Sequence, residues 1–176
     1  GYLFEALKES FKKSGFSNKN RRTTIQIASL YVIYYTSKTM GYSVKDNSVL
    51  VVDNKTGATA KSKSKKDDVF NLDIGKAIAL ARLLKNEAVE KFFCDAPQPK
   101  KNVVGQIITF PKDDKEYHRK VTYQVDSVDT YEGNLTIIKD ELASTYREKT
   151  LAGTKANANL KKKHDLVIID DTNAQY

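Results

Sequence analysis

The clearest pattern of hydrophobic and polar positions spans residues 49–84 and predicts two strands followed by a helix, a ββα unit. Residues 49–52 form a continuous apolar run, VLVV, and Gly57 can then adopt the positive φ that a hairpin turn requires. On the return strand Lys61 and Lys63 share one face, because side chains alternate across a strand. We therefore expect a hairpin with two lysines on the same side.

The helix of this unit is predicted to begin at a polar cap and to carry a broad apolar face. Asn71 and Asp73 are both candidate N-caps, since either side chain can accept bonds from the free N–H groups of the first turn. The positions that recur at helical spacing are Ile74, Ala77, Ile78, Ala81, Leu84 and Ala88. Leu80 and Leu83 widen this face, which favours packing on more than one side. Gly75 favours a close backbone approach over the alternative of phosphate binding, because neither a Walker motif nor a GxGxxG motif is present.

The first forty residues predict two further elements. Residues 2–13 have the spacing of an amphipathic helix, with Leu3, Phe4, Leu7 and Phe11 on one face. The segment 23–35 reads TTIQIASLYVIYY, and its β-branched and aromatic content predicts a strand. A helix is the alternative for this segment, because its apolar residues also fit helical spacing.

Beyond a proline-containing stretch at 95–102, the pattern changes to short strands separated by turns. The expected strands are 103–110, 120–128, 135–138 and 166–169. Several short strands in so few residues indicate a small, mostly antiparallel β-barrel-like region of SH3 or OB type. We therefore predict an α+β protein with an N-terminal helix and ββα unit in 1–94, a linker at 95–102 and a β-rich region in 103–176.

Composition and charge point to a globular protein with a polyanionic partner. The chain has 176 residues, 40% hydrophobic and 30% charged, and a formal net charge of +8. Residues 1–22 have a local balance of +4 and residues 38–66 one of +5. Such a basic half favours nucleic acid, although lysine-rich surfaces also serve solubility alone. No apolar run reaches the length of a transmembrane helix, so no membrane partner is expected.

The residue inventory argues against catalysis and against a bound cofactor. The chain has two histidines, one cysteine and no tryptophan, and no zinc-ligand spacing is present. Adjacent acids such as Asp67 and Asp68 are typical of turns and caps more than of metal centres. We expect a protein that is not an enzyme, binds neither metal nor cofactor, and is found in a reducing cytoplasm.

The candidate binding residues are basic side chains with tyrosines near some of them. The predicted contacts to nucleic acid or to a partner are Arg21, Arg22, Lys61, Lys63, Lys65, Lys66, Lys161, Lys162 and Lys163. The predicted stacking residues are Tyr34, Tyr35 and Tyr42. Tyrosines also pack on cores with a solvated hydroxyl, so the stacking role is a hypothesis. The loop 153–163, which ends in three lysines, is predicted to become ordered on binding.

The segment GATAKSKSKKDDVFNLDIGKAIALAR resembles one found in small uncharacterised proteins of Gram-positive bacteriophages and mobile elements. The resemblance covers residues 49–84 and implies a phage or mobile-element origin and a place in the host cytoplasm. The resulting hypothesis is a basic, phage-encoded binding protein that acts on nucleic acid or a host nucleoprotein or nuclease complex. Alternatives are an inhibitor of a host defence nuclease, similar to anti-CRISPR proteins, and a virion assembly component.

Overall fold

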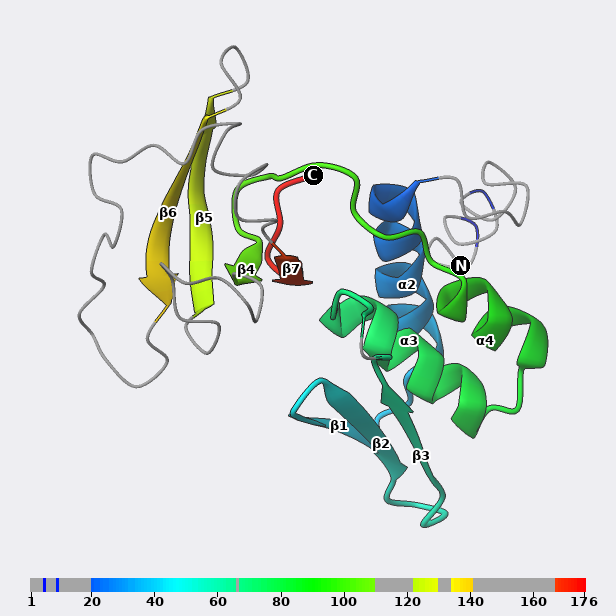
Figure 1. Cartoon of the computed structure of the whole chain (residues 1–176). Helices are drawn as coiled ribbons and strands as arrows, with labels where there is room; N and C mark the ends of the chain where they lie inside the picture. The colour runs from blue at the N-terminus through cyan, green and yellow to red at the C-terminus, as the bar shows by residue number, and fades with distance from the viewer. Residues whose placement is uncertain are drawn as a thin grey trace. The chain divides into compact units, whose positions relative to one another are not determined.

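A computed structural model of the chain describes residues 20–65, 67–109, 122–129, 134–140 and 167–176, together with Glu5 and Glu9. The chain divides into two compact units, Gly1–Gln98 and Pro99–Tyr176, each described by itself below. The division falls within the stretch 95–102. In its described part the fold is mixed α+β, with three helices and two antiparallel sheets (Figure 1). The predicted helix 2–13, apart from Glu5 and Glu9, and the loop 153–163 lie outside the described residues.

The first described helix, α2 (Arg21–Tyr35), corrects the strand predicted for 23–35 and confirms the alternative. Its N-cap is Asn20, whose side chain accepts a hydrogen bond from the Thr23 backbone N–H. Ile27, Ala28 and Tyr31 are all buried, at a spacing that places them on one side of a helix. Burial of this face in the helical core outweighs the β propensity of the segment.

A three-stranded antiparallel sheet follows, in the order β1 (Met40–Lys45), β2 (Ser48–Asp53) and β3 (Thr59–Lys63). The predicted hairpin is confirmed as β2 and β3, with Gly57 at φ +77° in the turn. The strand β1 was not predicted. It joins β2 through a two-residue turn in which Asp46 and Asn47 have φ values of 50° and 62°. Positive φ at both residues is the geometry of a type I′ hairpin turn.

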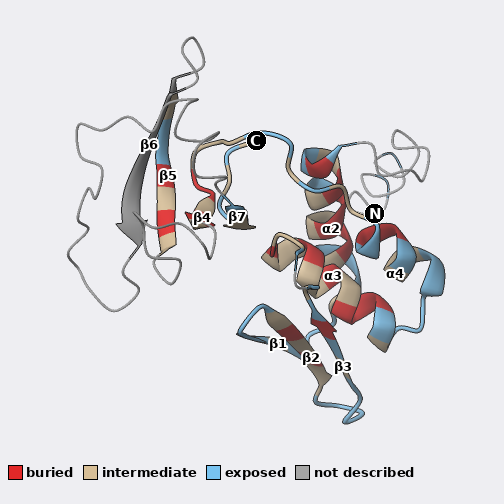
Figure 2. Ribbon diagram, in the orientation of Figure 1, coloured by how far each residue is buried: buried red, intermediate tan, exposed pale blue. Residues whose placement is uncertain are grey.

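The helix α3 (Leu72–Leu83) lies at the centre of the N-terminal unit and packs against α2, α4 (Glu87–Cys94), β2 and β3. Asn71 is its N-cap, accepting a bond from the Ile74 N–H, so the first of the two cap candidates is confirmed. Figure 2 shows buried residues along α3, and these belong to two clusters, one with α2 and α4 and one with the sheet, which confirms packing on more than one face. Leu84 and Ala88 were wrongly placed on the buried face, because α3 ends at Leu83 and both residues are exposed.

Gly75 allows α3 to approach the sheet closely. A Cβ at this position would lie 2.8 Å from Cγ2 of the buried Val49 and 3.7 Å from the Ser62 Oγ. The Ser62 hydroxyl donates a 2.7 Å hydrogen bond to the Gly75 carbonyl. The predicted close approach is thus confirmed, and it fixes which face of the sheet α3 covers.

The C-terminal unit contains a four-stranded antiparallel sheet in the order β6 (Asn134–Asp140), β5 (Thr122–Asp129), β4 (Ile107–Thr109) and β7 (Val167–Asp170). All four predicted strands are present, although β4 begins four residues later than the predicted 103–110, and Tyr123 and Val125 on β5 are buried. The predicted barrel is wrong for the described residues, because β6 and β7 are edge strands that do not pair with each other. The sheet is open in this part of the chain.

Candidate nucleic-acid interface

The two faces of the β1–β3 sheet differ in burial. The inner face carries Val49, Val51 and Ser62, all buried beneath α3. Residues paired across neighbouring strands lie on the same face, so the strand register assigns the remaining positions. The outer-face positions are Gly41, Ser43, Lys45, Ser48, Leu50, Val52, Thr59, Lys61 and Lys63. No described element of the N-terminal unit covers this face (Figure 1).

Three lysines gather at one end of the outer face. Lys45 on β1 and Lys63 on β3 both pair with Ser48 of the central strand, so they stand in one row across the sheet. Lys61 occupies the next row, two residues along β3. All three side chains are exposed. We call this surface, the nine outer-face positions with these lysines at one end, the lysine face.

The lysine face has little local neutralisation. None of its nine positions is acidic, and the ion pairs Arg82–Glu90 and Lys91–Asp95 lie elsewhere. Asp46, in the turn beside Lys45, is the nearest acid along the chain. Lys65 follows β3 and is also exposed. These lysines are therefore available to an external anion.

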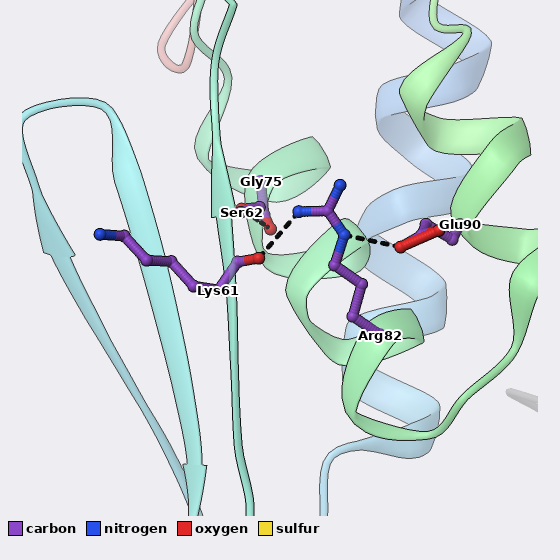
Figure 3. Close-up of polar contacts among 5 residues, drawn as sticks. All are labelled: Lys61, Ser62, Gly75, Arg82 and Glu90. Atoms are coloured by element: carbon purple, nitrogen blue, oxygen red, sulfur yellow. Dashed lines mark hydrogen bonds and ion pairs between the residues drawn. The ribbon is translucent and has the colours of Figure 1, made fainter.

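Arg82 holds β3 in place beside the helices. Its Nη1 donates a 2.8 Å hydrogen bond to the Lys61 carbonyl, and its Nε lies 2.6 Å from the Glu90 carboxylate. Figure 3 shows the Lys61 side chain pointing away from Arg82 while its backbone carbonyl faces the guanidinium. The strand that carries Lys61 and Lys63 is thus anchored through its backbone, and its two lysine side chains are exposed to solvent.

A small cavity of about 100 Å³ lies beside the end of β3, the start of α3 and the end of α4. Lys63, Lys65, Asp68, Arg82 and Cys94 are among its lining residues. Ligand pockets have volumes of roughly 300–1,000 Å³, so this cavity is too small to indicate a small-molecule substrate. Partial burial raises the pKa of the Cys94 thiol, which disfavours the reactive thiolate.

The two candidate arginines at the start of α2 differ in environment. Arg21 is only 6% exposed, and its guanidinium donates to the carbonyls of Pro97 and Val69 at 3.0 and 3.2 Å. It therefore joins segments of the N-terminal unit. Arg22 is exposed. Of the remaining predicted contacts, Lys66 and residues 161–163 lie outside the described residues.

The candidate stacking tyrosines do not lie on the lysine face. Tyr42 belongs to the inner face, its hydroxyl is 2.6 Å from that of Thr36, and the Lys76 ammonium lies 5.3 Å from its ring centroid. Tyr34 and Tyr35 are 38% and 39% exposed at the end of α2, with their ring centroids 4.7 Å apart. The structure therefore separates the exposed rings from the clustered lysines.

Lys45 is a member of this surface that sequence reasoning missed. Its position depends on β1, and the signal for β1 was the Asp-Asn pair at 46–47, which favours positive φ and lies between two alternating segments. Only the strand register places Lys45 in the same row of the sheet as Lys63.

The described residues contain no cluster of three histidine, cysteine or acidic side chains arranged to hold a metal ion. None of the described helices combines the length and the apolarity that crossing a bilayer requires. Comparison of the chain with protein-family models, with curated proteins and with solved structures finds no significant match.

Proposed function

We propose that this chain is a non-enzymatic nucleic-acid-binding protein whose contact surface is the lysine face. One observation carries the proposal: Lys45, Lys61 and Lys63 converge on one exposed end of a sheet face that no described element of the unit covers. The free energy of binding would come from the release of counterions when these lysines neutralise phosphates.

The scaffold around the lysines supports this role. A sheet held on its inner side by α3 fixes the backbone positions of the three lysines, so the backbone beneath them does not have to become ordered at binding. Arg82 fixes the Lys61 backbone without engaging its ammonium group. Phage origin and action in a host cytoplasm belong to the same proposal and rest on the resemblance of residues 49–84.

The experiment is a fluorescence-anisotropy titration of labelled nucleic acids with three forms of the full chain. The test variant carries Lys45→Glu, Lys61→Glu and Lys63→Glu. The matched control carries the same charge change at exposed lysines away from this cluster, at Lys38, Lys55 and Lys85. Thermal melts confirm that all three forms fold.

We expect the test variant to lose binding and the control to retain most of it. Three phosphate contacts predict that the affinity of the unmodified chain falls about 40-fold between about 50 and 200 mM salt, at roughly −0.9 in log–log slope per contact. Equal losses in both variants would mean that net charge matters and the lysine face does not. Absence of any binding at low salt would shift the proposal to a protein target, such as a host nuclease complex.

A further inference from the structure

We infer that the nucleic acid bound by the lysine face is a duplex, contacted through the phosphates of its backbone. This inference rests on the proposed function and names the class of ligand within it. It follows from which side chains share the face with the lysines and from how far apart the lysines stand.

Proteins that bind single strands combine a basic groove with aromatic rings on which successive bases stack. The nine positions of the lysine face include no aromatic residue. Its apolar members, Leu50 and Val52, lie on the central strand and are only partly exposed. A ligand bound to this face would contact lysine ammonium groups and small or aliphatic side chains, but no aromatic ring on which a base could stack.

The tyrosines that could stack bases are oriented elsewhere. Tyr42 points to the inner face and is bonded to Thr36. Tyr34 and Tyr35 belong to α2, in the helical part of the unit on the other side of the sheet (Figure 1). A single strand could not contact the clustered lysines and these rings on one continuous surface.

The spacing of the lysines suits two rows of phosphates. Strands in a sheet lie about 4.8 Å apart and rise about 3.3 Å per residue. The Cα atoms of Lys45 and Lys63 are therefore about 10 Å apart, and those of Lys61 and Lys63 about 7 Å apart. The grooves of a DNA duplex are about 6 and 12 Å wide, and phosphates flank both sides of each groove. The phosphates of a duplex are held at separations of this order. A single strand would have to become ordered on this face without gaining any contact to its bases.

The test measures the binding of the unmodified full chain to a blunt duplex and to each of its separate strands, at equal length and low salt. DNA and RNA duplexes are titrated in parallel, because the lysine face offers the same chemistry to both. A second variant, Tyr34→Leu, removes one of the two similarly exposed rings of α2, and its fold is checked by thermal melting.

Tighter binding of either duplex than of its own strands, unchanged in Tyr34→Leu, is the expected result. Equal or tighter binding of the single strands overturns the inference while the proposed function survives, and loss of that binding in Tyr34→Leu would identify stacking as the reason. If no form of nucleic acid binds, the proposed function itself fails.

Discussion

Replacing Gly75 with alanine tests the contact that positions α3 on the sheet. The added Cβ would lie 2.8 Å from Val49 Cγ2, inside the 3.4 Å at which ordinary van der Waals contact begins. Val49 is fully buried and β-branched, so its methyl group has little freedom to move. Overpacking costs about 1–3 kcal/mol, while alanine in a helix gains up to about 1 kcal/mol over glycine. We expect a net destabilisation of about 0–2 kcal/mol.

A double-mutant cycle with Val49→Ala separates these two contributions. Val49→Ala alone should destabilise the chain by about 1.5–3 kcal/mol through lost apolar burial. In its background the space beside Gly75 is open, so Gly75→Ala should stabilise by up to about 1 kcal/mol. The sign of the glycine substitution therefore reverses, with a coupling of about 1–3 kcal/mol.

Free energies of unfolding from denaturant titrations measure every corner of this cycle. Gly41→Ala serves as the control, because a Cβ at that glycine would meet no atom within 4 Å. If Gly75→Ala has the same effect with valine or alanine at 49, the methyl contact is not what requires glycine there. The assignment of α3 to the inner face of the sheet would then lose its main support.

Two further predictions concern titratable groups. The Tyr31 hydroxyl is buried without a hydrogen-bond partner among the described residues, and burial raises its pKa to about 12. Tyr31→Phe should therefore leave stability unchanged or raise it by about 1 kcal/mol in a denaturant titration, and a clear loss would reveal a partner for the hydroxyl. Asp53 accepts bonds from the Thr39 hydroxyl and the Lys55 N–H, which lower its pKa below 3.8. The contribution of Asp53 to stability is therefore complete above 3.8 and is lost as pH falls through the lower pKa of the folded state. Because Thr39→Val removes one of these hydrogen bonds, it should raise the Asp53 pKa in an NMR titration. An unchanged pKa would exclude the Thr39 bond as the cause of the shift.

Local patterns predicted the β2–β3 hairpin and α3 well, because turn chemistry, capping and periodicity agree there. Gly57 has the positive φ expected of it, and Asn71 caps α3 as expected. Segment 23–35 was assigned wrongly, since its β-branched and aromatic residues favour a strand while its helical form buries Ile27 and Tyr31. The partner surface that decides this lies on distant parts of the chain.

The same division between local and distant information applies to the lysine face and to the second sheet. Alternation alone placed Lys61 and Lys63 on one side, but only pairing between strands adds Lys45. The strands of the C-terminal unit were predicted from their residues. Whether they close into a barrel depends on which strands pair, and the local pattern of apolar residues does not determine this pairing. Likewise, the local sequence around Arg21 does not indicate that its guanidinium donates hydrogen bonds to the backbone carbonyls of Pro97 and Val69.

The strand β3 lies at the edge of its sheet, and this position would link the proposed ligand binding to self-association. An edge strand offers free backbone groups to a strand from another molecule, and charged side chains and covering groups discourage such pairing. On β3 the repulsion comes from Lys61 and Lys63, while Arg82 occupies the Lys61 carbonyl. A polyanion that neutralises the lysines would remove the repulsion and leave the Arg82 hydrogen bond as the remaining barrier along this edge in the described structure. If the lysine face binds a polyanion as proposed, the solubility of the chain would be coupled to the occupancy of that face through one strand.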